Sequence, residues 1–502
     1  MRILLVYSSL YKVTGLPLGV ASLNAILKNN GHEVSIFETT FYCIDESSVE
    51  IRDRENRLMA KKVSNEDEHL GTDHSSNIFD DLKLRLSEFK PDMMGISIFE
   101  STYLLSKKLF AVAKENIPSI ITIAGGTFPM LAPEVVVDDK NVDIVCVGEG
   151  ENSLLELCDA IDGNLDFSHI QGMWIKSNGS IIKNSIASIP DINKLPPPDY
   201  TGFDSRLFYK PMQGKYYKMV NIETSRGCPY NCSYCASPAF KSKYKKIDGC
   251  SYFRTLNIDK IMSQIYCQID IHNPEFVYFS SETFLAMPES DFEVFIKEYK
   301  KVNLPFWFQT RFETITEEKI KKLQEVGLYW MTLGVEHGNE EFRKKVLNRH
   351  YKNQIVEAGM HVLNNCGVGT TLNNMAGFPF ETRELVFDTI NLNKKLLSIN
   401  PLIETNLYIF APFRGCALYD LCVSEGFLDK TDFINSTDLS DESLLKFSDE
   451  FKQDLKGLLK TFNLYVRLNE EYYPRIRIAE KDDEEGKQAH NELMQIVMQQ
   501  SR

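Results

Sequence analysis

Residues 223–238 read ETSRGCPYNCSYCASP and contain three of the eleven cysteines of this 502-residue chain, Cys228, Cys232 and Cys235. Their C-x3-C-x2-C spacing places three thiols on one short loop, and thiolates are the ligands that hold iron–sulfur clusters. Three ligands leave one iron of a four-iron cluster open for catalysis, whereas structural zinc needs a fourth ligand, which does not follow at the usual spacing. We therefore predict a catalytic [4Fe-4S] cluster, with these cysteines as its metal ligands and catalytic residues.

A regular alternation of strand and helix patterns surrounds this loop, from about residue 215 to residue 411. Six βα units of this kind predict a partial (β/α)6 barrel of the TIM type, whose sites lie at the C-terminal ends of the strands. The expected strands are MVNIETS (219–225), FVYFS (276–280), PFWFQTR (305–311), YWMTLGV (329–335), the run near TTLNNMAG (370–377) and TNLYIFAP (405–412).

The first 165 residues show a second pattern, in which short continuous apolar runs alternate with helical stretches. Such runs are typical of parallel strands covered on both faces, so we predict an α/β domain with a doubly wound, Rossmann- or flavodoxin-like sheet. Residues 41–76 interrupt the pattern with polar sequence and are interpreted as an insertion or mobile loop. The expected strands are RILLVY (2–7), EVSIFE (33–38), DMMGISI (92–98), IITIAG (120–125) and DIVCVG (143–148).

Three consecutive prolines, at positions 196–198, indicate a domain boundary, because proline removes a backbone donor and stiffens a connector. We expect a linker over 166–214, the barrel over 215–411 and a helical C-terminal region over 412–502. The charged stretch AEKDDEEGKQAHNELMQ (479–495) is expected to be a solvated helix or tail.

The composition narrows the class of protein. A net charge of −14 gives little attraction for a phosphate backbone, so nucleic acid is not expected as a partner. The sequence shows neither a signal peptide at its start nor a membrane span, and a cytoplasmic location is expected. In that reducing compartment the cysteines would not form a disulfide framework.

The segment RGCPYNCSYCASP (226–238) resembles the signature of the radical SAM superfamily. Later segments match that family in order: SSETF (280–284), GVEHG (334–338) and MAGFPFET (375–382), with Arg311 at the end of the third strand. The resemblance implies that the open iron binds S-adenosylmethionine (SAM), and that an electron from the cluster yields a 5′-deoxyadenosyl radical. The residues implied to bind SAM are Tyr234, Ser281, Glu282, Arg311, Glu336 and Gly377.

Three positions depart from the family pattern. Ser281 stands where many relatives carry an acidic residue, His337 replaces a serine, and Phe380 replaces a glycine. The sequence gives no reason for the histidine.

The N-terminal segments GLPLGVASLNAILKNNGHEV (15–34), GIS (95–97), AGGTFP (124–129) and VGEGE (147–151) resemble the cobalamin-binding domain fused to many radical SAM enzymes. Small residues at the carboxyl ends of the strands allow a bulky ligand to approach the backbone. A D-x-H-x-x-G motif is absent after the first strand, which is compatible with cobalamin bound without a histidine below the cobalt. The residues implied to bind cobalamin are Ser8, Gly15, Ser97, Gly125, Gly126, Gly148 and Glu149.

The two resemblances together imply a cobalamin-dependent methyltransferase that acts on an unactivated carbon of a small molecule. A cobalamin-associated rearrangement, cyclisation or other oxidative reaction without net methylation is the alternative. A tRNA or protein methylthiotransferase is disfavoured, because the N-terminal region lacks closely spaced cysteines for a second cluster, and the cysteine trio argues against a non-catalytic binding protein. The expected partners are a small-molecule substrate and an electron donor such as flavodoxin or ferredoxin.

Overall fold

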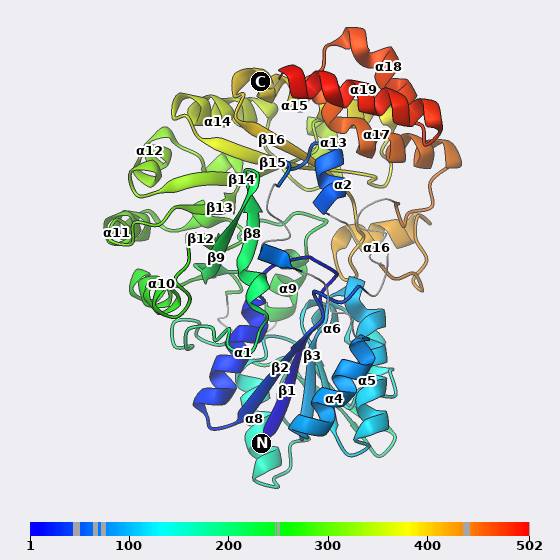
Figure 1. Cartoon of the computed structure of the whole chain (residues 1–502). Helices are drawn as coiled ribbons and strands as arrows, with labels where there is room; N and C mark the ends of the chain where they lie inside the picture. The colour runs from blue at the N-terminus through cyan, green and yellow to red at the C-terminus, as the bar shows by residue number, and fades with distance from the viewer. Residues whose placement is uncertain are drawn as a thin grey trace.

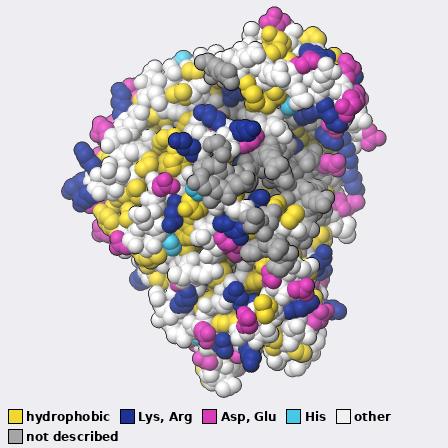
Figure 2. All heavy atoms as spheres, viewed as in Figure 1, with side chains coloured by type: hydrophobic (Ala, Val, Ile, Leu, Met, Phe, Trp, Pro, Cys, Tyr) yellow, Lys and Arg dark blue, Asp and Glu magenta, His cyan; other side chains and the backbone are white. Residues whose placement is uncertain are grey.

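The computed structural model describes residues 1–43, 51–63, 69–71, 77–245, 247, 251–434 and 442–500. Within these ranges it contains an N-terminal and a central seven-stranded sheet, a small two-stranded sheet and a group of helices at the C-terminal end (Figure 1). No helix in the described ranges is both long and apolar enough to span a membrane. Basic and acidic side chains are interspersed on the face shown in Figure 2.

The N-terminal sheet has the strand order β2-β1-β3-β4-β5-β6-β7. Strands β1 to β5 are parallel and follow the order 2-1-3-4-5, which is the flavodoxin-like order of a doubly wound sheet. They are β1 (Arg2–Tyr7), β2 (Glu33–Glu38), β3 (Met93–Ser97), β4 (Ile121–Gly125) and β5 (Ile144–Cys146). This sheet confirms the predicted fold class of the N-terminal region.

Two further strands extend this sheet beyond β5. β6 (Met173–Ser177) pairs antiparallel with β5, and β7 (Ser180–Lys183) pairs antiparallel with β6. Both lie in the segment predicted as a linker, so the first part of 166–214 forms regular structure. The two strands are short and partly exposed, so the sequence has no continuous apolar run that would indicate them.

Helices cover both faces of the N-terminal sheet because side chains alternate along each strand. Leu4 and Val6 of β1 belong to one apolar cluster, and Ile3 and Leu5 belong to another on the opposite face. The first cluster includes residues of α4 and α5, and the second includes residues of α1 and α8. These helices are α1 (Leu18–Asn29), α4 (Ile78–Phe89), α5 (Tyr103–Asn116) and α8 (Glu151–Asp162).

The polar insertion after β2 reaches the central sheet. It contains α2 (Ile51–Asn56), which Figure 1 shows beside β16 (Ile403–Ile409). Asn463 donates a hydrogen bond from Nδ2 to the carbonyl oxygen of Arg57 (2.8 Å), and Lys61 Nζ donates to Gln213 Oε1 (2.5 Å). The described parts of the insertion therefore pack on the barrel, while residues 44–50, 64–68 and 72–76 lie outside the described ranges.

The central sheet confirms the predicted partial barrel. Its order is β16-β15-β14-β13-β12-β9-β8, with six parallel strands and an antiparallel edge strand, β8. The strands are β8 (Tyr209–Met212), β9 (Lys215–Glu223), β12 (Phe276–Ser280), β13 (Phe306–Thr310), β14 (Leu328–Glu336), β15 (Gly369–Ala376) and β16. The sequence did not indicate β8, which is only four residues long.

The outward side chains of the barrel strands, such as Val277, Phe279 and Leu333, pack against a layer of helices. The inward side chains surround a lumen. Its lower end, near the N-terminal ends of the strands, is filled by Met212, Met219, Phe276 and Trp330. The outer helices are α10 (Ile258–His272), α11 (Glu289–Tyr299), α12 (Glu317–Glu325), α14 (Asn353–Asn365) and α15 (Arg383–Ile399). This arrangement leaves the C-terminal ends of the strands free to carry a site.

The C-terminal region is helical, as predicted. It contains α16 (Ala417–Ser424), α17 (Asp449–Arg467), α18 (Tyr473–Ala479) and α19 (Glu484–Gln500). The charged stretch expected to be a solvated helix or tail forms part of α19, and that helix buries Ala489, Leu493 and Val497 in a shared apolar cluster with α17. The prediction missed this packed face because its apolar residues are spaced four apart among charged ones.

Candidate active site

The cysteine loop connects β9 and the short strand β10 (Ser225–Arg226) to helix α9 (Ala236–Tyr244). Gly227 begins the loop with a φ of +85°, and a Cβ atom there would lie 2.7 Å from the carbonyl oxygen of Tyr252. Only glycine fits this close approach, which explains the residue before Cys228. Cys232 is buried, Cys228 and Cys235 are partly exposed, and Cys235 directly precedes α9.

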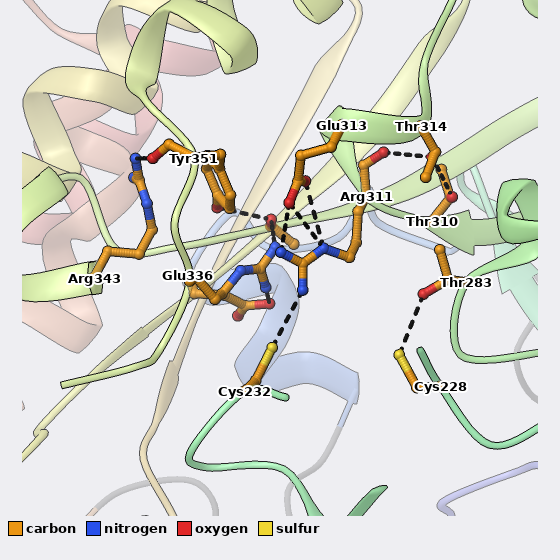
Figure 3. Close-up of polar contacts among 12 residues, drawn as sticks. Cys228, Cys232, Thr283, Thr310, Arg311, Glu313, Thr314, Glu336, Arg343 and Tyr351 are labelled. Carbon is orange, nitrogen blue, oxygen red and sulfur yellow. Dashed lines mark hydrogen bonds and ion pairs between the residues drawn. The ribbon is translucent and has the colours of Figure 1, made fainter. Parts of the chain in front are cut away.

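Two of the three thiols contact residues that follow barrel strands (Figure 3). Cys228 Sγ lies 3.6 Å from Thr283 Oγ1, and Arg311 donates from Nη1 to Cys232 Sγ at 3.2 Å. Burial raises the pKa of the Cys235 thiol to about 11. No group of three His, Cys, Asp or Glu in the described ranges is arranged around one metal ion, and a four-iron cluster does not need this because each cysteine binds a different iron.

Arg311 follows β13 and is almost fully buried beside the cysteine loop. Its guanidinium forms an ion pair with Glu313 (2.5 Å) and stacks on the ring of Tyr230, with its central carbon 3.7 Å from the ring centroid. The stacking and the ion pair fix the plane of the guanidinium, while Nη1 points toward Cys232. The predicted carboxylate-binding arginine therefore lies next to the predicted cluster ligands.

Glu336 and Tyr234, both predicted SAM residues, are joined by Arg349. Arg349 Nη1 donates to Glu336 Oε1 (2.6 Å) and to the Tyr234 hydroxyl oxygen (3.0 Å), and its Nη2 donates to the carbonyl oxygen of Gly334 (2.8 Å). A Cβ atom at Gly334 would lie 2.2 Å from Glu336 Oε1, so the glycine of GVEHG makes room for this carboxylate. The sequence does not mark Arg349 as a site residue, because it belongs to no motif and lies thirteen residues after Glu336.

Backbone strain is present at the end of β14. Glu336 has a φ of +66°, and the register between β14 and β15 shifts between Gly334 and Glu336. A left-handed conformation is unusual for glutamate and is common at functional sites, where the surrounding structure holds it in place. Here the ion pair with the buried Arg349 supplies that restraint.

His337 is explained by a buried contact with Glu381. His337 Nε2 lies 3.0 Å from Glu381 Oε1, and Asn339 donates its backbone N–H to His337 Nδ1 (3.0 Å). Because Nδ1 accepts, the proton is on Nε2, which donates to the carboxylate. Glu381 Oε2 also accepts from the backbone N–H groups of Gly377 and Phe378 (3.1 Å for Phe378), so the histidine locks the G-F-P-F-E-T turn that contains Gly377.

Ser281 and Glu282 follow β12 on the same side of the barrel. The Ser281 hydroxyl is buried and has no hydrogen-bond partner among the described residues. The Glu282 side chain reaches solvent but has many protein atoms around it. The resulting loss of solvation raises its pKa to about 7, and the Glu223 carboxylate raises it further. Both groups can therefore accept or donate to a bound ligand.

A cavity of about 270 Å³ opens at the carboxyl edge of the N-terminal sheet. Its lining includes five of the seven predicted cobalamin residues, Ser97, Gly125, Gly126, Gly148 and Glu149. Ser8 and Gly15 are not part of it. Ser8 is fully buried and accepts a hydrogen bond from the Ser106 hydroxyl (3.2 Å), and the loop with Gly15 leads to the barrel, where Asn221 donates to the carbonyl oxygen of Leu16 (3.3 Å).

An ion cluster links this cavity to the cysteine loop. Arg226 Nη1 lies 2.7 Å from Glu149 Oε2 and 2.6 Å from Glu151 Oε1, and its Nε lies 2.8 Å from Glu223 Oε1. Arg254 forms a second ion pair with Glu149. Glu149, Glu151, Glu223 and Arg226 also line the cavity. The sequence singled out Glu149 for cobalamin alone and missed its pairing with the barrel.

Comparisons with known proteins agree with this arrangement. The model of the radical SAM superfamily matches residues 222–392, and the model of the B12-binding domain matches residues 6–158. The chain carries a radical SAM domain and a B12-binding domain. A [4Fe-4S] cluster, SAM and cobalamin are therefore the cofactors of this radical SAM protein.

Relatives of this radical SAM protein include two methyltransferases. "Cytidylyl-2-hydroxyethylphosphonate methyltransferase" of Streptomyces wedmorensis is 23% identical over 452 residues, which are 82% of this chain and 79% of the relative. "Uncharacterized methyltransferase PH0819" of Pyrococcus horikoshii is 23% identical over 360 residues, covering 70% and 73%. An "anaerobic magnesium-protoporphyrin IX monomethyl ester cyclase" of Rubrivivax gelatinosus is 24% identical over 325 residues, covering 62% and 56%.

Solved structures share the fold over the whole chain. The methyltransferase TsrM of Kitasatospora setae, with cobalamin and a [4Fe-4S] cluster bound, has a TM-score of 0.63 at 13% identity and covers 100% of this chain and 99% of its own. The radical enzyme OxsB, with aqua-cobalamin and SAM bound, has a TM-score of 0.66 at 13% identity and covers 99% and 71%.

The residues of this chain fit the two metal-containing cofactors. Three thiols on one loop are a suitable donor set for a cluster with one open iron. In the N-terminal cavity, Gly126 and Gly148 have φ values of +101° and +132°, and side chains at either position would collide with neighbouring atoms less than 3 Å away. The described residues that line this cavity include no histidine.

Proposed function

We propose that this chain cleaves SAM reductively and, with cobalamin, transfers a methyl group to an unactivated carbon of a small-molecule substrate. When bound, the cluster supplies the electron that breaks a carbon–sulfur bond of SAM, and cobalamin carries the methyl group. An external donor such as flavodoxin or ferredoxin would supply the electrons. The two methyltransferase relatives support the choice of reaction.

The observation that carries the proposal is the common wall of the two cofactor sites. Arg226 lines the N-terminal cavity and pairs with Glu149 and Glu151 there, yet it lies only two residues before Cys228. A cofactor in that cavity and a cluster on the cysteine loop would thus be neighbours. One substrate in the barrel mouth could meet a radical formed on one side and a methyl group delivered from the other.

The strand ends of the barrel are proposed to hold SAM. Arg311 presents a planar, fixed guanidinium that can donate two parallel hydrogen bonds to the SAM carboxylate. Glu336, held by Arg349, can accept from the ribose hydroxyls or the amino group, and Glu282 with Ser281 faces the same ligand. Tyr234 and the turn at Gly377, fixed by Glu381, complete the proposed site.

The test needs no substrate. The full chain is reconstituted anaerobically with iron, sulfide and hydroxocobalamin, reduced and incubated with SAM whose methyl group carries deuterium. S-adenosylhomocysteine is expected in an amount close to that of the bound cobalamin, together with 5′-deoxyadenosine, and a preparation without cobalamin should give no S-adenosylhomocysteine. If cobalamin is bound and no S-adenosylhomocysteine forms, methyl transfer is ruled out.

A cobalamin-associated rearrangement, cyclisation or other oxidative reaction is the second candidate, and the similarity to the cyclase favours it. Such a reaction uses the same radical but needs no methyl group from SAM. The same experiment separates the two, because this candidate predicts 5′-deoxyadenosine as the only nucleoside product.

A further inference from the structure

A second cavity lies inside the barrel and is distinct from the cobalamin cavity. It measures about 480 Å³, and the apolar cluster that includes Trp330 closes its lower end. Gln309 lines it and lies two residues before Arg311, so both face the lumen about 6–7 Å apart along the strand direction. The cavity therefore lies one layer of side chains below the proposed SAM site, within reach of a substrate that extends upward from it.

Lys210 is the unusual residue of this cavity. It comes from the edge strand β8, and its ammonium donates to Asn221 Oδ1 (2.9 Å) and lies 4.7 Å from the ring centroid of Tyr278. Among the described residues no carboxylate forms an ion pair with it, and loss of solvation is the one influence on its pKa. The side chain touches the cavity but is otherwise surrounded by protein, and this loss of solvation lowers its pKa to about 8.

A buried ammonium without a counter-charge costs folding free energy, and natural proteins rarely keep one that has no opposite charge beside it. A buried lysine with a purely structural role would be expected to form an ion pair with a carboxylate. The one acidic residue among the described lining residues, Glu404, instead accepts from Gln213 Nε2 (2.9 Å). The missing counter-charge of Lys210 is therefore expected to come from a ligand.

The insertion from the N-terminal domain adds positive charge to the same cavity. Lys61 bonds Gln213 next to β8, and Arg54 reaches the hydroxyl of Tyr408 on β16 (3.4 Å) with its buried Nε left without a partner among the described residues. Because β8 and β16 are the two edges of the sheet, the insertion closes the open side of the barrel with basic residues. Figure 2 shows Lys and Arg side chains gathered on this part of the surface.

We propose that the barrel cavity binds an oxyanion of the substrate, a carboxylate or a phosphoryl group, through Lys210 with help from Arg54 and Lys61. The anion would anchor one end of the molecule deep in the lumen and leave its reacting carbon in the layer of Arg311 and Glu336. The assignment of this ligand as the substrate rests on the proposed function, whereas the binding of an anion does not.

Calorimetric titration of the anaerobically reconstituted full chain tests the proposal, with inorganic phosphate in one series and acetate in another at constant ionic strength. At least one anion is expected to bind, and the better one identifies the oxyanion. Lys210→Met should weaken this binding at least about tenfold, while Lys210→Arg, which keeps the charge, should stay within about threefold of the wild type. Lys215→Met on the same hairpin is the matched control, since Lys215 is exposed and should have no effect.

Two results would overturn the proposal: neither anion binds the wild type, or Lys210→Met binds as well as the wild type. Lys210→Arg guards against misfolding, because a folded arginine variant with wild-type affinity shows that the charge at this position matters. S-adenosylhomocysteine measured on the same preparations separates the two claims. Anion binding without this product contradicts methyl transfer alone, and the product without anion binding contradicts the anion site alone.

Discussion

Arg226 Nη1 and Glu149 Oε2 lie 2.7 Å apart and join the N-terminal sheet to the loop that carries the predicted cluster ligands. The carboxylates of Glu151 and Glu223 contact the same guanidinium, and all of these side chains are largely buried. A cation surrounded by three carboxylates ties the two domains together between the two predicted cofactor sites.

Arg226→Met should destabilise the fold by about 3–5 kcal/mol, because it leaves buried carboxylates without their counter-charge. Denaturant unfolding of the reconstituted chain measures this free energy. Arg475→Met is the control, since Arg475 pairs with Glu492 on the surface and its loss should cost no more than about 1 kcal/mol. Equal losses of unfolding free energy in the two variants would contradict a structural role for the ion cluster around Arg226.

The pH dependence of the Arg226→Met variant has a definite sign. Burial already raises the pKa of Glu149 in the folded protein, and the loss of Arg226 raises it further. A carboxyl group with a raised folded pKa takes up a proton on folding, so the deficit is greatest above the folded pKa and shrinks as the pH falls through it. Unfolding at neutral and mildly acidic pH checks this, and a deficit that grows with acidity would contradict it.

Cys228, Cys232 and Cys235 changed together to alanine should abolish the cluster and the formation of 5′-deoxyadenosine. Iron content and product analysis after anaerobic reconstitution measure both. Cobalamin content should remain, because its cavity lies in the other domain. Cys43→Ala is the control, since Cys43 is exposed and outside the loop, and it should retain full activity. Unchanged SAM cleavage in the triple variant would remove the cluster assignment.

Gly125→Val should reduce bound cobalamin at least about tenfold while leaving the cluster intact. Gly125 lines the N-terminal cavity, and a Cβ atom there meets only Cys146 at 3.7 Å, so a larger side chain fits the backbone and occupies cavity space. Gly15→Val is the matched control, because Gly15 lies outside the cavity with open space around it. Cobalamin and iron contents report the result, and equal cobalamin loss in both variants would refute the location of the site.

Arg349 is a positioning residue for Glu336 and Tyr234. Arg349→Met alone leaves the Glu336 carboxylate unpaired and should destabilise the fold, while Arg349→Met with Glu336→Gln removes both charges and should recover stability. The double variant should still bind SAM at least about tenfold more weakly than Glu336→Gln alone, because Tyr234 and residue 336 are no longer held together. Unfolding and calorimetry with SAM separate these effects, and equal SAM affinity in the double variant and in Glu336→Gln would exclude the positioning role.

Anion binding in the barrel cavity should be strong below pH 8 and fall above it, because Lys210 has a pKa of about 8 and loses its charge there. Asn221 and Tyr278 face the ammonium, and burial raises the pKa of Tyr278 to about 12, so neither changes charge in this range. Arg54 and Lys61 also line the cavity, and Glu404, whose pKa is raised by burial, is the one acidic residue among the described lining residues. Phosphate titrations across pH 7–9 check this, and Lys210→Arg should remove the fall.

Much of the fold could be predicted because its strands are buried on both faces and read as continuous apolar runs. β6, β7 and β8 were not predicted, because they are short and half exposed and no apolar run marks them. The cysteine loop could be recognised because its three cysteines are close in sequence. Arg349 and Arg226 could not, because the fold brings each to its partners from separate segments. Ser8 and Gly15 follow β1 in sequence, but neither lines the N-terminal cavity, so their role at cobalamin stays a prediction.

We expect this one chain to hold a four-iron cluster and cobalamin in adjoining sites. The most direct test is the cofactor content after anaerobic purification with iron, sulfide and hydroxocobalamin, read by absorbance, iron analysis and mass spectrometry. About one cobalamin and about four cluster irons per chain are expected. An intact cluster without cobalamin would contradict the adjoining sites and would leave the N-terminal cavity to another ligand.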